Sequence, residues 1–165
     1  MSFSLSTELT TERLVLRSWT SDEASAVLGD RRGAVWAADF PAEGDRVIAG
    51  LLTKHPDWLG PFGHRLIIER VSGFVVGSIG LFWPATDGQL EIGYGIVASR
   101  RGRGYATEAT RALAAHALTA PEVHTVSAEV ELSNPPSVRV LEKAGFVRLS
   151  VQDGIARYCA AATRR

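Results

Sequence analysis

The sequence predicts a mixed α/β (α+β) fold in which about four helices flank a mostly antiparallel central sheet of about seven strands. Three strand-like runs follow one another in mid-chain with only short turns between them, which is typical of an antiparallel meander. Segments with helical spacing stand on both sides of this meander, so helices and strands are mixed along the chain. The 165 residues suit one domain, and we expect residues 1–165 to fold as a single unit.

The part of the chain before the meander holds one expected strand and two expected helices. Apolar and charged residues alternate over residues 12–19, which predicts a strand. Residues 21–28 predict a short helix whose N-cap is Ser21 or Asp22. Residues 41–54 predict a second helix with an apolar side made by Val47, Ile48, Leu51 and Leu52.

The remaining elements follow from turn residues and from changes of period. Residues 55–63 read HPDWLGPFG, and their proline and glycine content predicts a loop. Strands are expected over residues 64–70, 74–83, 89–98, 123–131, 146–151 and 155–161. Helices are expected over residues 103–119 and 135–144.

The composition excludes several classes of protein. Lys plus Arg number 18 and Asp plus Glu number 18, so the chain lacks the surplus of cations that nucleic-acid and membrane-surface binding need. No apolar run approaches the roughly 20 residues of a membrane span. The single cysteine, Cys159, and four scattered histidines show no metal-ligand spacing. We therefore expect a cytoplasmic protein with no metal and with no nucleic-acid or membrane partner.

A glycine- and arginine-rich turn is the most informative segment. It lies between an expected strand and an expected helix and comprises Arg101, Gly102, Arg103, Gly104, Tyr105, Ala106 and Thr107. Glycines let a backbone approach a ligand closely, and the first turn of a helix offers unpaired N–H groups to an anion such as a pyrophosphate. The alternative is a solvated basic turn that precedes a glycine-capped helix.

Other nucleotide and hydrolase motifs fit the sequence less well. The turn resembles the dinucleotide fingerprint, but Thr107 stands where the third glycine belongs, and the turn follows an antiparallel meander. No Walker A motif is present. Val76 stands where the nucleophile elbow of an α/β-hydrolase has its first glycine, before Ser78.

Two motifs resemble those of the GNAT superfamily of N-acetyltransferases. Arg101-x-x-Gly104-x-Ala106 is similar to its acyl-CoA-binding motif, and NPPSVRVLEKAGF, which begins at Asn134, is similar to the next motif. The segment TERLVLRSW near the start resembles the first strand of the branch that includes ribosomal-protein alanine N-acetyltransferases. The resemblance implies a GNAT-like sheet and transfer of an acetyl group from acetyl-CoA, as cosubstrate, to a primary amine by direct attack.

The resemblance also implies roles for individual residues. The backbone N–H of Ile96 or Val97 would bind the thioester carbonyl, and Asn134 would contact CoA or cap the following helix. A base or a water relay must deprotonate the amine, and Glu91 lies near the position of the family's carboxylate. The alternative is that Glu91 is a solvent-facing acid.

The departing CoA thiolate either takes a proton from the protein, directly or through water, or leaves unassisted. Many members of the family place a tyrosine seven residues after the motif asparagine, whereas this chain has Leu141 there. Ser137 is the substitute that the resemblance suggests, although a serine in the first turn of a helix is often only a capping residue. This departure supports an alternative function, a non-catalytic acyl-CoA-binding regulatory module of the same fold.

The sequence says least about the acceptor, which is an amine-bearing peptide N-terminus or a small molecule. Aromatic residues could line an acceptor cleft, or belong to the core or to a homodimer contact: Trp36, Phe40, Trp58, Phe62 and Trp83. Acidic residues could attract a cationic acceptor or be merely solvated: Asp39, Glu43, Asp45 and Asp57.

Overall fold

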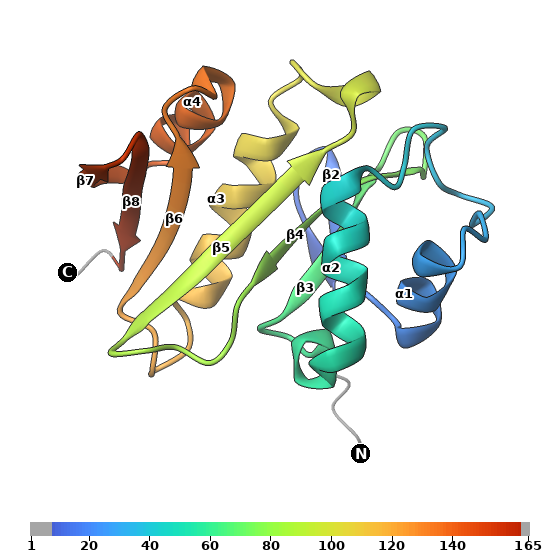
Figure 1. The fold of residues 1–165 in the computed structure, drawn as a ribbon, viewed down its shortest axis with the longest axis horizontal. Helices are drawn as coiled ribbons and strands as arrows, with labels where there is room; N and C mark the ends of the chain where they lie inside the picture. Colours follow the sequence, from blue (N-terminus) through green and yellow to red (C-terminus); the bar gives the residue numbers. More distant parts are fainter. Residues whose placement is uncertain (1–7, 163–165) are drawn as a thin grey trace.

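The computed structural model describes residues 8–162, which form an eight-stranded sheet with helices on both faces (Figure 1). The strand order is β1-β2-β3-β4-β5-β6-β8-β7, and every neighbouring pair is antiparallel except β5 and β6. The strands are β1 (Glu8–Thr10), β2 (Leu14–Ser18), β3 (His64–Glu69), β4 (Val75–Leu81), β5 (Gln89–Ile96), β6 (Thr125–Glu131), β7 (Val147–Gln152) and β8 (Ile155–Ala161). This architecture confirms the predicted fold class.

Four α-helices cover the sheet. Helices α1 and α2 pack against each other on one face, and α3 and α4 lie on the other (Figure 1). Their bounds are α1 (Ser21–Leu28), α2 (Glu43–Lys54), α3 (Tyr105–Ala117) and α4 (Pro135–Lys143). Two short 3₁₀ helices, η1 (Pro56–Leu59) and η2 (Ala98–Arg100), occupy segments expected to be a loop and the end of a strand.

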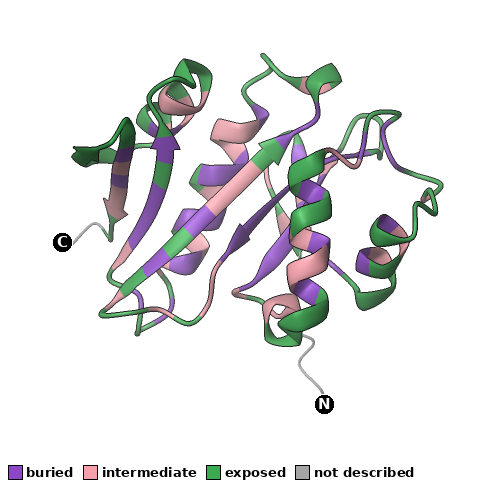
Figure 2. Cartoon of the chain, viewed as in Figure 1, coloured by how far each residue is buried: buried purple, intermediate pink, exposed green. Residues whose placement is uncertain are grey.

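Three expectations about local structure were wrong. Strand β1 was missed because its three residues are too few to show a period. The N-cap of α1 is Thr20, whose hydroxyl accepts from the N–H of Glu23 while the Glu23 carboxylate accepts from the N–H of Thr20. The third error concerns α2, whose buried residues are Asp45, Ala49 and Leu52. Of the expected apolar side, Leu52 is buried and Ile48 and Leu51 are half-buried, but Val47 is exposed. Figure 2 shows buried, half-buried and exposed stretches along this helix.

The strands β5 and β6 separate along their length. They pair only over Gln89–Glu91 and Thr125–Ser127, at the end where β5 begins. From Ile92 onward β5 keeps its antiparallel partner β4 but no longer pairs with β6. Figure 1 shows the two strands diverging above this point, with the start of α4 beside the wider end. The divergence exposes one edge of β5 to ligands.

Candidate functional site

Two cavities lie on the two sides of β5. The α2 cavity, of about 320 Å³, is bounded by α2, β3, β4 and β5. The α3 cavity, of about 510 Å³, is bounded by β5, the turn after it, α3 and α4. Both are lined by Tyr94, Gly95, Ile96 and Arg101, so they meet at the last residues of β5 and at the turn.

The glycine-rich turn shapes one end of the α3 cavity. Gly102 and Gly104 adopt left-handed φ angles of 78° and 82°, a region that favours glycine. Gly104 is the N-cap of α3, and its carbonyl accepts the first helical hydrogen bond, from Glu108. The three residues between Gly104 and Glu108 form the first turn of α3, and their N–H groups therefore have no helical partners. These residues line the cavity: Tyr105, Ala106 and Thr107.

Cationic side chains surround this helix N-terminus. Arg100 and Arg101 line the α3 cavity from the turn, and Arg139 and Lys143 line it from α4. The N-terminus of a helix and nearby guanidinium groups favour phosphate oxygens. These residues fit the diphosphate of CoA. The two cations that α4 contributes, Arg139 and Lys143, were not expected from the sequence.

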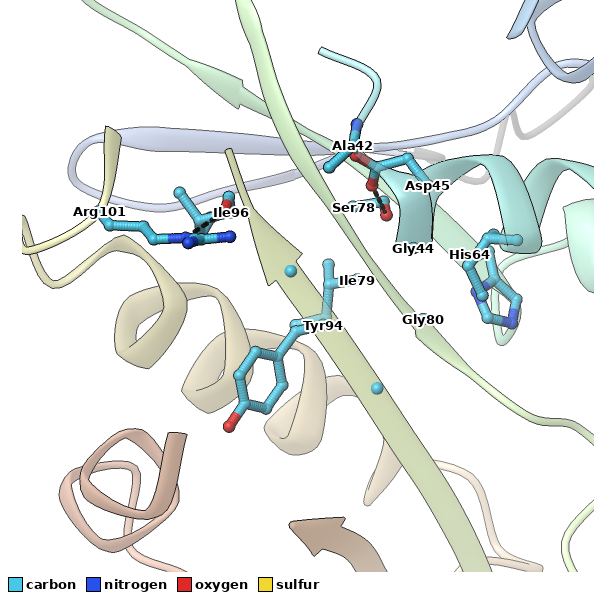
Figure 3. A pocket seen from close by; sticks show the side chains of 13 residues that line it. Ala42, Gly44, Asp45, His64, Ser78, Ile79, Gly80, Tyr94, Ile96 and Arg101 are labelled. Carbon is cyan, nitrogen blue, oxygen red and sulfur yellow. Dashed lines mark hydrogen bonds between the residues drawn. The ribbon is translucent and has the colours of Figure 1, made fainter. Parts of the chain in front are cut away.

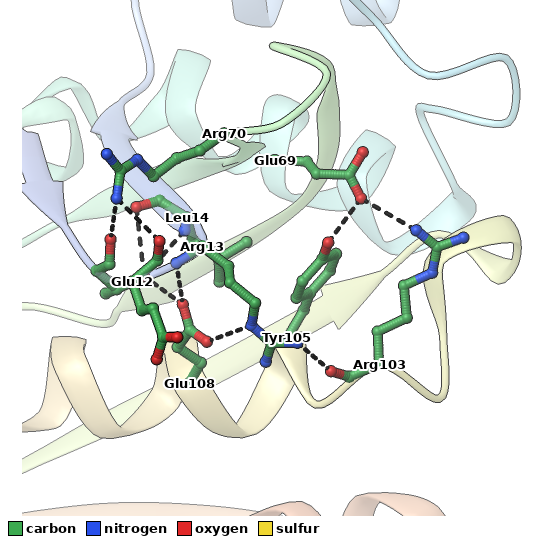
Figure 4. A network of polar contacts seen from close by, with 9 residues as sticks. Glu12, Arg13, Leu14, Glu69, Arg70, Arg103, Tyr105 and Glu108 are labelled. Atoms are coloured by element: carbon green, nitrogen blue, oxygen red, sulfur yellow. Dashed lines mark hydrogen bonds and ion pairs between the residues drawn. The ribbon is translucent and has the colours of Figure 1, made fainter.

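Arg103 lies outside the cavity to which the sequence assigned it. Its guanidinium is 3.3 Å from the carboxylate of Glu69, and its carbonyl accepts a hydrogen bond from Arg13 at 2.7 Å (Figure 4). The side chain is thus turned toward β3 and away from the α3 cavity. Arg103 holds the turn in place rather than lining the anion site.

Glu69 is a buried carboxylate that ties the turn to the sheet. Its side chain is only 3% exposed and accepts a hydrogen bond from Tyr105 at 2.8 Å (Figure 4). It also accepts a hydrogen bond from Ser72 at 2.6 Å and pairs with Arg100. Burial alone would raise the pKa of Glu69, but these hydrogen bonds lower it below its ordinary value. Glu69 therefore stays ionised and offsets part of the positive charge at the turn.

A second carboxylate, Glu108, joins the start of β2 to α3. It pairs with Arg13 at 2.8 Å and accepts a hydrogen bond from Thr11 (Figure 4). The same Arg13 side chain donates to the carbonyl of Arg103. Through these contacts Glu108 fixes the position of the turn.

The two expected donors to the thioester carbonyl differ in the structure. Ile96 lines both cavities, and its carbonyl accepts a hydrogen bond from Arg101 at 3.0 Å. The N–H of Val97 already donates to the carbonyl of Val76 at 2.9 Å. Val97 also lines neither cavity, so its N–H is not available to a ligand. The expectation for Val97 is therefore corrected.

Glu91 lies where β5 and β6 still pair, away from their divergent end. It is exposed and lines neither cavity. Partial burial and the neighbouring Glu129 raise the pKa of its carboxyl, against the effect of Arg157. This geometry leaves Glu91 out of direct contact with a ligand in either cavity.

The start of α4 brings Asn134 and Ser137 to the α3 cavity. The amide oxygen of Asn134 accepts a hydrogen bond from the N–H of Ser137, so Asn134 caps the helix while lining the cavity. The hydroxyl of Ser137 lies 2.7 Å from the hydroxyl of Tyr94 on β5. The sequence offered no signal for this contact, because β5 and α4 are about 40 residues apart.

The α2 cavity contains three buried polar side chains (Figure 3). Asp45 accepts hydrogen bonds from the Ser78 hydroxyl and from the N–H of Ala42, and burial raises the pKa of its carboxyl. Burial lowers the pKa of His64 to about 4, so this imidazole is neutral at pH 7. Of the acidic residues proposed for acceptor binding, Asp45 is the one that lines this cavity.

The other residues suggested for an acceptor cleft lie elsewhere. None of the five aromatic residues lines either cavity. Trp36 packs edge-on against Phe40 in the core, and Trp58 donates to the carbonyl of Trp83. Asp39 accepts hydrogen bonds from Ser99 in the turn after β5. The aromatic residues thus serve packing.

Two further features are absent from residues 8–162. These residues contain no group of three or more His, Cys, Asp or Glu side chains that could hold a metal ion. None of the helices in the same range has the length and apolar character needed to cross a membrane.

Comparisons with known proteins agree with this geometry. Residues 13–147 match the family model described as an acetyltransferase (GNAT) domain. An uncharacterized N-acetyltransferase of Bacillus subtilis, YjdG, is 33% identical over 87 residues, which are 52% of each chain. The match therefore spans about half the length of this curated relative.

Solved structures share the fold over nearly the whole chain. An acetyltransferase from Agrobacterium tumefaciens has a TM-score of 0.70 and 23% identity, with 98% of each chain covered. RimJ of Mycobacterium smegmatis, in complex with CoA-disulfide, has a TM-score of 0.62 and 22% identity, covering 90% of this chain and 82% of its own. Together with the family match, these observations show that the chain belongs to the GNAT family of acetyltransferases.

Proposed function

We propose that this protein transfers the acetyl group of acetyl-CoA to a primary amine by direct attack of the amine on the thioester. The observation that carries this proposal is that two cavities meet at Tyr94, Gly95 and Ile96. One cavity has the character of an anion site, and the other is smaller and contains buried polar groups. A thioester at the junction would be accessible to an amine from the opposite side of β5.

The α3 cavity is the proposed site of acetyl-CoA. The free N–H groups at the start of α3, together with Arg101, Arg139 and Lys143, would bind the diphosphate. The pantetheine arm would then run along the edge of β5 that β6 leaves free. The RimJ structure, a complex with CoA-disulfide on a similar fold, supports a ligand of the CoA type.

The α2 cavity is the proposed site of the acceptor amine. Its polar lining of Asp45, Ser78 and neutral His64 suits a cationic or hydrogen-bonding group, either a peptide N-terminus or a small-molecule amine. An α-amine has a pKa of about 8 and a lysine-type amine of about 10, so the acceptor must lose a proton before it attacks. Glu91 would act on this proton only through water, because it lines neither cavity.

A covalent acyl-enzyme is not needed in this scheme. Cys159, on β8, lines neither cavity. The hydroxyl of Ser78 donates directly to Asp45, with no base between them to activate it for attack on a thioester. Direct attack by the amine is therefore the simpler route.

Incubation with acetyl-CoA and a panel of amines tests the proposal. The panel contains peptides with N-terminal alanine or serine, spermidine and an aminoglycoside, and the readouts are CoA release and product mass. We expect a product heavier by one acetyl group with at least one amine. Gly104→Asp serves as the control, because it removes the anion site. If the wild type binds acetyl-CoA tightly but yields no acetylated product, the non-catalytic acyl-CoA-binding module is favoured. If the wild type does not bind acetyl-CoA, both the acetyltransferase and the non-catalytic module are contradicted.

A further inference from the structure

The sheet surface under the α2 cavity contains three glycines, Gly80 of β4 and Gly93 and Gly95 of β5. Ser78 of β4 pairs with Gly95, and directly opposed residues of antiparallel strands point to the same face of the sheet. A Cβ atom at Gly95 would meet no other atom within 4 Å. The space above Gly95 is therefore open, and the side chain of Ser78 borders it.

Two hydrogen bonds hold the carboxylate of Asp45 beside this open space. Oδ1 accepts from the hydroxyl of Ser78, and Oδ2 accepts from the N–H of Ala42 at 2.9 Å. The Cβ atoms of an opposed pair are about 5 Å apart, so a group bound above Gly95 lies within reach of Ser78 and of the carboxylate that it contacts. A carboxylate has about four acceptor sites, which leaves Asp45 able to accept from a ligand as well.

Asp45 is a buried carboxylate without an ion-pair partner. It is 4% exposed, and among the residues that the structure describes it takes part in no salt bridge. Burying an unpaired carboxylate is costly, so a cationic group bound beside Asp45 would be stabilised. Burial raises the pKa of its carboxyl, against the hydrogen bonds from Ser78 and Ala42. Asp45 is thus a stronger base than an exposed aspartate.

The other ionisable groups around the α2 cavity are neutral or have other contacts. Those that line it are His64 of β3, Tyr94 of β5 and Arg101 of the turn. The imidazole of His64 has a pKa of about 4 and is neutral at pH 7. Arg101 donates to the carbonyl of Ile96 at 3.0 Å, and Figure 3 shows the phenol ring on the opposite side of β5. On α2 itself, Arg46 pairs with Asp30 at 2.7 Å.

We propose that Asp45 is the base that takes a proton from the acceptor ammonium bound above Gly95, while Ser78 holds the carboxylate in place. This inference rests on the proposed function. One N–H bond of the ammonium breaks, its proton goes to Asp45, and the electron pair stays on nitrogen. That pair forms the bond to the thioester carbon, and the pair of the C–S bond goes to sulfur. A second proton leaves nitrogen through water to the thiolate, and Asp45 gives its proton to solvent. Asp45 is the catalytic residue, and Ser78 is a positioning residue.

The dependence of kcat/KM on pH in Asp45→Asn tests this assignment with the panel amine that the wild type acetylates fastest. An asparagine can still accept from Ala42 and donate to Ser78, so the acetyl-CoA affinity should stay near that of the wild type. Without the base only the unprotonated amine reacts. At pH 7 kcat/KM should therefore fall about tenfold for an α-amine and about 1,000-fold for a lysine-type amine. This deficit should shrink about tenfold per pH unit toward the pKa of the amine.

Ser78→Ala tests the same assignment without altering Asp45. The hydrogen bond from Ser78 lowers the pKa of the Asp45 carboxyl, so its loss should raise that pKa. The acid limb of the kcat/KM profile should then move to higher pH by about one unit. If Ser78 only packed against α2, the substitution would lower activity without moving this midpoint.

Glu23→Gln is the matched control. Glu23 accepts from the N–H of Thr20, the N-cap of α1, just as Asp45 accepts from the N–H of Ala42, the N-cap of α2. It pairs with Arg17 and lines neither cavity. This variant should lose stability, as a damaged cap does, but keep the pH profile of the wild type.

The outcomes separate this inference from the proposed function. If Asp45→Asn binds acetyl-CoA and keeps the activity of the wild type, or shows the same deficit at every pH, Asp45 is not the base while acetyl transfer stands. If Glu91→Gln acquires the sloping profile and Asp45→Asn does not, the proton leaves through water to Glu91 and the inference is wrong. If the wild type acetylates no amine, the proposed function fails and the inference fails with it.

Discussion

Gly104→Asp is expected to raise the Kd of acetyl-CoA by about 100-fold or more, because the new carboxylate would repel the diphosphate at the start of α3. Gly104 has a φ of 82°, where a side chain costs about 1–2 kcal/mol. A Cβ atom here would also lie 3.2 Å from Nη2 of Arg13, which holds the turn through the carbonyl of Arg103. Calorimetric titration with acetyl-CoA measures the effect.

Gly102→Ala is the matched control for backbone strain. Gly102 has a similar φ of 78°, but a Cβ atom there would meet no other atom within 4 Å. We expect this variant to lose a comparable amount of stability while its acetyl-CoA affinity falls far less. Wild-type affinity in a folded Gly104→Asp variant would mean that the diphosphate does not bind at this turn.

Glu69→Gln is expected to lower the free energy of unfolding by about 1–3 kcal/mol at pH 7. The buried carboxylate accepts hydrogen bonds from Ser72 and Tyr105 and pairs with two arginines of the turn, and an amide replaces these contacts poorly. The affinity for acetyl-CoA should fall less than the stability does. Arg100 lines the α3 cavity, and without its anionic partner Glu69 its positive charge is free to attract the ligand. Chemical denaturation and calorimetry measure the two quantities.

The pH dependence of this effect has a definite sign. The pKa of Glu69 is lower in the folded protein than its ordinary value, so its contribution to stability is complete above that ordinary value. The contribution is lost as the pH falls through the lowered pKa. The stability difference between wild type and Glu69→Gln should therefore be constant near neutrality and shrink in acid. Glu122→Gln, at an exposed position, is the control; a difference that grows in acid would contradict the assigned role.

Local patterns in the sequence predicted most of the fold. The meander was visible because alternating residues and short turns mark each strand, and β3, β4 and β5 pair as those signals indicated. The start of α3 was visible because Gly104 precedes a run with helical spacing. The buried side of α2 was predicted only in part: Leu52 is buried as expected, but packing also buried the small Ala49 and the polar Asp45 and left Val47 exposed.

The site was less predictable because its contacts are non-local. Nothing near Glu69 in the sequence indicates that Arg100 and Arg103 will pair with it, since the pairing depends on how β3 lies beside the turn. The same holds for Tyr94 and Ser137, which meet only because β5 and β6 diverge. The motif pointed to the turn whose residues line the α3 cavity, but only the fold shows that Arg103 and Val97 have other partners.

The central claim is that acetyl-CoA and the acceptor amine approach the end of β5 from opposite sides. A structure of the protein with bound CoA tests this claim most directly. We predict that the diphosphate accepts hydrogen bonds from the first-turn N–H groups of α3, with the sulfur beside Ser137 and Tyr94. The α2 cavity should stay open on the other side of the strand. A diphosphate bound away from the turn, or a sulfur distant from Tyr94 with the pantetheine outside the divergence of β5 and β6, would contradict the account.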